Sequence, residues 1–161
     1  MQVKHVKIYT DGGCLGNPGP GGYAAVLLIS GHRKEISGGY RLTTNNRMEL
    51  MAAIEGLKTL KYRCQVSLYS DSRYLVDAIN KGWLTNWIKR NWIKSDKAEV
   101  KNIDLWQQLS ELCRKHEIIF IWIKGHDGNL ENERCDRLAD EVANRKGLPP
   151  DILYEKGRGA L

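Results

Sequence analysis

The chain has 161 residues, and its 25 Lys and Arg against 19 Asp and Glu give a formal net charge of +6. Hydrophobic residues make up 42% and charged residues 27%, a globular composition that excludes a disordered chain. The longest apolar run, residues 23–29, is too short to span a bilayer, and the N-terminus has no apolar signal core. We therefore expect one soluble cytoplasmic domain over residues 1–161, monomeric and without membrane contact.

The four cysteines are scattered, without a Cys-x-x-Cys pair or a closely spaced histidine. This spacing argues against a zinc site, and a disulfide framework is not expected in an unexported chain of this size. We expect free thiols. The sequence leaves open whether Cys14 and Cys135 lie close together in space.

The first third of the chain predicts three strands. Residues 3–10 alternate between apolar and polar, and a Gly/Pro-rich segment at 11–22 predicts a loop. Residues 23–30 and 34–42 predict two further strands. Because these segments follow one another so closely, we expect an antiparallel meander.

The remaining elements alternate between helix and strand. We expect helices at 46–60, 72–81, 102–115 and 131–146, and strands at 65–70 and 117–123. This order predicts an α/β fold in which a mixed five-stranded sheet has helices on both faces. Residues 82–101 form a Trp-rich basic stretch, and the tail at about 148–161 has no clear pattern and is predicted to be flexible.

Four acidic residues lie where a predicted strand ends or a predicted helix begins: Asp11, Glu49, Asp71 and Asp136. Each also has a purely structural interpretation. Asp11 suits a turn, Glu49 fits a capping box with Asn46 as the N-cap, Asp71 could cap the next helix, and Asp136 could be a solvated surface charge.

Taken together, the four carboxylates indicate a metal site. Strand ends and nearby helix starts can converge on one cleft of a mixed sheet. Two like charges roughly 4 Å apart repel by about 4 kcal/mol at an effective dielectric of about 20. A convergent cluster therefore needs a divalent cation, and carboxylate oxygens suit Mg²⁺ or Mn²⁺ better than zinc.

Several longer motifs carry a resemblance to a known family. They are YTDGGCLGNPG at 9–19, TNNRMEL at 44–50, SDS at 70–72, KGH at 124–126 and ENERCD at 131–136. In these segments the chain resembles the bacterial type 1 ribonucleases H (ribonuclease HI), over residues 3–142. The resemblance implies a ribonuclease H-like fold and an endonuclease that cuts the RNA strand of RNA–DNA hybrids, leaving 5′-phosphate and 3′-hydroxyl ends.

The resemblance also implies roles for the acidic residues. Asp11, Glu49, Asp71 and Asp136 would be catalytic and would hold two Mg²⁺ ions, for which Mn²⁺ can substitute. One ion would activate the attacking water and the other would stabilise the leaving oxygen. His126 would transfer a proton or help to release the product, although a lone loop histidine is more often a surface residue.

Asn17, Asn45 and Asn46 match residues that contact the hybrid in this family, with Cys14 close by. The full predicted substrate-binding set is Cys14, Asn17, Thr44, Asn45, Asn46, Arg73, Trp83, Trp87, Lys89, Arg90 and Asn132. The resemblance makes 82–101 a basic protrusion that grips the DNA strand through cations and indole rings. Alternatively, Asn45 and Asn46 only cap a helix and the tryptophans are core residues. Trp106 and Trp122 are expected to be packing residues.

Two positions depart from the family pattern. The loop at 126–130 reads HDGNL, where relatives often carry a second histidine and a proline, so Asp127 adds a negative charge beside His126. Arg73 stands where an amide is common, and could strengthen a phosphate contact or shift substrate preference.

Two other functions are possible for such a chain: a non-catalytic hybrid-binding module and a related metal-dependent DNA exonuclease. The intact carboxylates argue against the first, and the Asn-rich and Trp-rich segments argue against the second.

Overall fold

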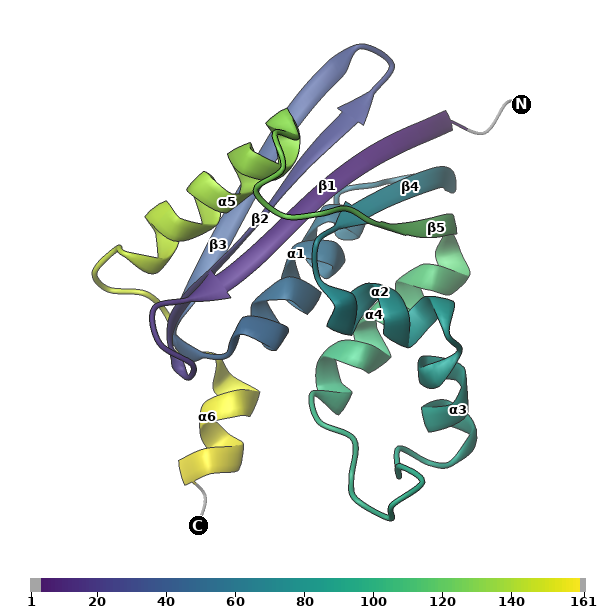
Figure 1. The fold of residues 1–161 in the computed structure, drawn as a ribbon, viewed down its shortest axis with the longest axis vertical. Coiled ribbons are helices and arrows are strands. Elements are labelled where there is room, and N and C mark those ends of the chain that lie inside the picture. Colours follow the sequence, from purple (N-terminus) through teal and green to yellow (C-terminus); the bar gives the residue numbers. More distant parts are fainter. Residues whose placement is uncertain (1–3, 160–161) are drawn as a thin grey trace.

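The computed structural model describes residues 4–159, in which a five-stranded sheet is surrounded by helices (Figure 1). The elements in chain order are β1 (Lys4–Cys14), β2 (Gly19–Ile29), β3 (His32–Thr43), α1 (Asn45–Lys58), β4 (Cys64–Ser70), α2 (Arg73–Asn80), α3 (Trp83–Lys89), α4 (Ile103–Lys115), β5 (Glu117–Trp122), α5 (Leu130–Ala143) and α6 (Ile152–Gly159). The predicted strand start at residue 3 lies outside the described residues. Within residues 4–159, no helix has the length and apolar character needed to cross a membrane.

The sheet is mixed, with the strand order β3-β2-β1-β4-β5. Strands β1, β2 and β3 are antiparallel neighbours, whereas β4 runs parallel to both β1 and β5. The predicted antiparallel meander and the predicted mixed five-stranded sheet are confirmed.

Helices cover both faces of this sheet, as predicted. Figure 1 shows α5 in front of the antiparallel strands and α1 behind them. Along β2, successive side chains point to opposite faces of the sheet. Ala25 and Leu27 belong to the larger core with α1, whereas Ala24 and Val26 pack against Cys135 of α5. Apolar side chains on both faces are what a strand covered on both sides requires.

The glycine-rich segment at 11–22 is mostly strand, which corrects the prediction of a loop. β1 continues to Cys14 and β2 begins at Gly19, so that the ladder extends to the pair of Cys14 with Gly21. Glycines in a strand often mark a place where another backbone approaches closely. Here they let helices pack directly on the strands, and Gly/Pro content alone does not separate this case from a loop.

Helix α1 is capped by Thr44 rather than by Asn46. The Thr44 side chain accepts a hydrogen bond of 3.3 Å from the Arg47 N–H, and Asn46 lies inside the helix. The capping-box interpretation of Asn46 and Glu49 is therefore wrong. Glu49 is left free to face the sheet instead.

The segment after Pro150 contains a helix, α6, that the sequence pattern did not predict. Asp151, directly before α6, is buried and pairs with Arg47 of α1. In Figure 1, α6 lies at the same end of the molecule as the loop that follows α3.

Candidate active site

Asp11 and Asp71 come together where β4 separates from β1. The last pair of the parallel ladder is Tyr9 with Tyr69, whose rings stack at 4.5 Å. Each aspartate lies two residues beyond its tyrosine: Asp11 is still in β1, paired with Ala24 of β2, whereas Asp71 directly follows β4. Because the parallel ladder between β1 and β4 ends just before them, the two carboxylates lie near each other.

Glu49 joins them because α1 packs directly onto β1 at Gly12. A Cβ atom at residue 12 would lie 2.6 Å from the backbone N of Glu49 and closer still to the Met48 carbonyl group. Any larger residue would push the first turns of α1 away from the strand. Glycine is therefore required for Glu49 to reach Asp11.

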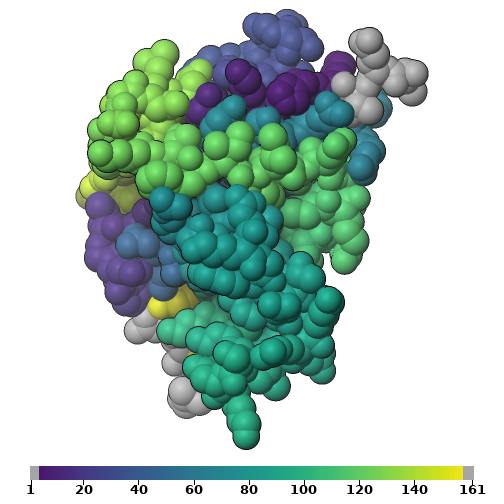
Figure 2. Space-filling view, turned by 45° about the vertical axis from the view of Figure 1, so that its right-hand side comes forward, coloured from purple at the N-terminus to yellow at the C-terminus, as the bar shows by residue number. Residues whose placement is uncertain are grey.

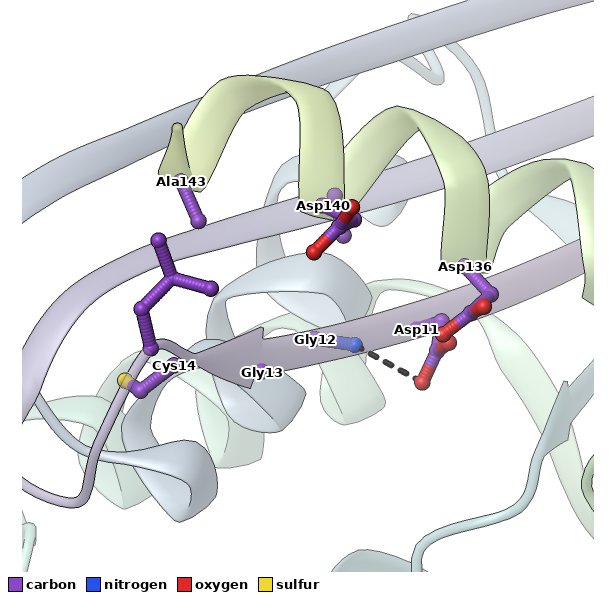
Figure 3. A pocket seen from close by; sticks show the side chains of 9 residues that line it. Asp11, Gly12, Gly13, Cys14, Asp136, Asp140 and Ala143 are labelled. Carbon is purple, nitrogen blue, oxygen red and sulfur yellow. Dashed lines mark hydrogen bonds between the residues drawn. The ribbon is translucent and has the colours of Figure 1, made fainter. Parts of the chain in front are cut away.

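The carboxylates of Asp11, Glu49 and Asp71 each offer an oxygen within 4.8 Å of the others. Asp136 of α5 lies outside this group of three but close enough to Asp11 for its charge to raise the pKa of that carboxyl. Asp11 and Asp136 line a pocket of about 170 Å³ between β1 and α5. Figure 3 shows their carboxylates facing one another. Asp140, one helical turn after Asp136, lines the same pocket.

Burial and mutual repulsion make this cluster hard to ionise. Burial, followed by the charges of Asp71 and Asp136, raises the pKa of Asp11 to about 8. The same causes, burial first and then the charge of Asp11, raise the pKa of Glu49 well above its ordinary value. In addition, Glu49 Oε1 is buried without any hydrogen-bond partner. These oxygens fit a hard divalent cation, which would supply the missing partner and neutralise the repulsion.

The loop after β5 lies against Asp71. A Cβ atom at Gly125 would be 2.6 Å from Asp71 Oδ2, so a side chain at this position would force the Asp71 carboxylate to shift. His126 follows with a φ of 57°, a left-handed conformation that is rare for residues other than glycine. Its side chain is exposed, and so is that of Asp127.

Three of the predicted substrate contacts, Cys14, Asn17 and Asn45, are linked by hydrogen bonds between the β1–β2 connection and the start of α1. Asn45 Oδ1 accepts a hydrogen bond of 2.7 Å from the Cys14 N–H, and Asn17 Oδ1 accepts one of 3.0 Å from the Asn45 N–H. Thr44, the helix cap, adjoins them, and Asn46 is exposed one residue further on. Asn45 thus holds the connection between β1 and β2 against the start of α1. Asn46 does not cap the helix, so that interpretation is wrong.

The basic stretch at 82–101 projects from the body of the molecule, at the lower end in Figure 2. Trp83 is 40% exposed, whereas Trp87 packs edge-on against the buried Trp106. Lys89 and Arg90 are exposed. The packing role predicted for Trp106 is confirmed.

The two other predicted contacts differ in burial. Asn132 is 2% exposed, and its Nδ2 has no hydrogen-bond partner, so its contact with substrate stays a prediction. Arg73 lies on the ring of Trp122, which sequence analysis had assigned to packing. The sequence reasoning quoted Gly125 in the KGH motif without predicting its contact with Asp71, and it missed Asp140. The four-residue spacing of Asp136 and Asp140 could have revealed Asp140, because it puts both on one helix face.

Comparison with known proteins agrees with this geometry. The family model described as RNase H matches residues 3–144. A protein of Rippkaea orientalis named Ribonuclease H is 59% identical over 152 residues, which cover 94% of this chain and 93% of that one. One of Syntrophus aciditrophicus with the same name is 60% identical over 151 residues, covering 94% and 87% of the two chains.

Among solved structures, LC9-RNase H1, described as a type 1 RNase H with the type 2 active-site motif, superposes with a TM-score of 0.79. It is 28% identical, and the match covers 99% of this chain and 84% of that one. With most of its length matched by the family model and by close relatives, this chain belongs to the ribonuclease H family.

Proposed function

We propose that the protein hydrolyses the RNA strand of RNA–DNA hybrids in a reaction that depends on Mg²⁺. The observation that carries the proposal is the meeting of Asp11, Glu49 and Asp71 within 4.8 Å, with Glu49 Oε1 buried and unpartnered. Membership of the ribonuclease H family supports the choice of substrate.

All four acidic residues would act as metal ligands. Asp11, Glu49 and Asp71 form the shared group, and Asp136 of α5 would add a further carboxylate beside Asp11. When bound, two Mg²⁺ ions supply an activated water and charge stabilisation for the leaving 3′ oxygen. We propose that His126, exposed on the loop that contacts Asp71, carries a proton to or from the reacting phosphate.

Selection of the hybrid rests on two surfaces beside this cluster. The amides of Asn17, Asn45 and Asn46 and the backbone near Cys14 suit the shallow minor groove, where 2′-hydroxyls mark the RNA strand. The exposed Lys89, Arg90 and Trp83 suit the phosphates and sugars of the DNA strand. We also propose that the protein acts as a monomer in the cytoplasm, as predicted from the sequence.

A cleavage assay with strand-specific labels tests the proposal. With Mg²⁺, we expect the RNA strand of the hybrid to be cut, RNA and DNA duplexes to stay intact, and EDTA to stop the reaction. Asp71→Asn and Glu49→Gln should each abolish cleavage while hybrid binding persists. Glu111→Gln removes an exposed carboxylate from α4 and should leave the rate unchanged. Cutting of the DNA strand, or full activity of Asp71→Asn, would refute the proposal.

A further inference from the structure

Arg73 has surroundings that hold its side chain in one place. It is the first residue of α2, and its guanidinium carbon lies 3.7 Å from the centre of the Trp122 ring. A planar guanidinium at this distance stacks on the indole face and is attracted to its π-electrons. A long side chain that would otherwise sample many rotamers is thereby ordered.

Trp122 is in turn fixed to the carboxylate cluster. It is the last residue of β5, it pairs with Ser70, and its indole N–H donates a hydrogen bond of 3.1 Å to the backbone carbonyl of Asp71. The position of the guanidinium is therefore set relative to Asp71 by two direct contacts.

The hydrogen-bonding capacity of this guanidinium is unused. The Arg73 side chain is 62% exposed, and the carboxylate that pairs with it, that of Asp77, is 3.9 Å away and lies 3.6 Å from Lys81. In the described part of the chain, the guanidinium donates no hydrogen bond within the usual distance. An arginine has five N–H donors, so this ordered cation can receive a ligand.

We propose that Arg73, stacked on Trp122, is a preformed binding site for a backbone phosphate of the hybrid, next to the phosphate held at the Asp71 cluster. The fixed fork of N–H donors matches two phosphate oxygens. Because Arg73 follows Asp71 by two residues and is held beside it through Trp122, we assign the contact to a nucleotide neighbouring the one that is cut. An amide at this position would bring neither the charge nor the stack. The inference rests on the proposed hybrid substrate and adds a residue that strengthens its binding.

Equilibrium binding of a labelled RNA–DNA hybrid without divalent metal tests this site apart from catalysis. The affinity is measured over a series of salt concentrations for the wild type, Arg73→Gln and Arg63→Gln. Arg63 precedes β4, at the opposite end of that strand from Asp71, and gives the same loss of charge. For Arg73→Gln we expect affinity at low salt to fall roughly fivefold. The slope of log affinity against log salt should become shallower by about 0.7 to 0.9. Arg63→Gln should match the wild type.

Arg73→Lys tests the contribution of the positive charge separately from that of stacking on Trp122. It keeps the positive charge but loses the planar fork, so we expect a slope close to that of the wild type and a weaker affinity. With Mg²⁺, Arg73→Gln should raise KM more than it lowers kcat, because the contact binds substrate without touching the reacting atoms.

Two results would overturn the inference: a slope for Arg73→Gln equal to that of Arg63→Gln, or an Arg73→Lys affinity equal to that of the wild type. Either would leave the proposed function intact, provided that the wild type still cuts the hybrid. Failure of the wild type to cut any hybrid would instead remove the proposed function.

Discussion

Asp11 lies among the other acidic residues of the site. Its pKa is set by burial and by the charges of these neighbours. Its side chain is buried, it faces the charges of Asp71 and Asp136, and its pKa is raised from an ordinary value of 3.8 to about 8. Without metal, and at pH values between about 4 and 8, the folded protein therefore keeps a proton on Asp11 that the unfolded chain has lost. Folding and proton binding are coupled at this one carboxyl.

The metal-free protein should consequently become less stable as pH rises from about 4 to about 8, because the folded state binds more protons than the unfolded state in that window. Thermal melts in EDTA at pH 5 and pH 8 measure the loss. Asp11→Asn should reduce the dependence on pH, since it removes the group that titrates. Added Mg²⁺ should raise Tm more at pH 8 than at pH 5, because the ion competes with protons for the carboxylates. An EDTA melt whose Tm rises across this window would contradict the assignment.

The acidic residues of the site could be predicted, while their supporting residues could not. Asp71 directly follows β4 and Glu49 lies near the start of α1, positions that sequence periodicity locates, whereas Asp11 lies inside β1, which continues to Cys14. The contacts that order them are different. Gly125 touches Asp71 from 54 positions away along the chain, and Trp122 reaches its carbonyl from 51 positions away. Neither contact leaves a local pattern in the sequence.

At the scale of elements, Arg47 ties together three segments near the site. Its guanidinium donates to Asp104 of α4 at 2.8 and 2.9 Å and to Asp151, ahead of α6, at 2.7 and 2.9 Å. Thr43 of β3 adds a hydrogen bond of 2.7 Å to the same Asp151 carboxylate. Arg47 and Asp151 are both buried, so the pair is shielded from solvent.

Asp151→Asn should therefore destabilise the protein clearly. It removes the charge that balances a buried guanidinium, and Asp104 compensates only in part, so the expected loss of unfolding free energy is about 2 to 4 kcal/mol. Urea unfolding measures this loss. Glu155→Gln is the matched control, because Glu155 of α6 pairs with Arg41, which is exposed on the surface. It should change stability far less. Equal stability of the two variants would show that the buried pair does not anchor α6.

The same contacts explain which elements the sequence could predict. Strands and helices with a continuous apolar stripe, such as α4 and β5, were located within a residue or two. Helix α6 was not, because Ile152 and Leu153 remain exposed and its anchor is an ion pair between residues 104 positions apart. The Gly-rich ends of β1 and β2 were missed for a related reason: the helices that pack on those glycines lie elsewhere in the chain.

At the scale of the whole molecule, positive and negative charges are separated. The acidic cluster lies between β1, α1, β4 and α5, whereas the protrusion at 82–101 carries exposed cations. Among the described residues, no carboxylate forms an ion pair with Lys89, Arg90 or Lys94. Unpaired cations on a projecting segment are available to phosphates, and they account for part of the net charge of +6.

Replacing Lys89, Arg90 and Lys94 together by Ala should weaken hybrid binding and flatten its salt dependence by about 0.7 to 0.9 for each phosphate contact that is lost. Because these residues lie on the protrusion and outside the carboxylate cluster, kcat at saturating hybrid should change little while KM rises. A second triple variant, with Ala at the exposed Lys34, Lys61 and Lys115, removes the same charge elsewhere on the surface. If binding depended only on net charge, both triple variants would lose salt dependence equally. If the protrusion holds the DNA strand, only the first will, and circular dichroism melts of both will show that neither result comes from unfolding.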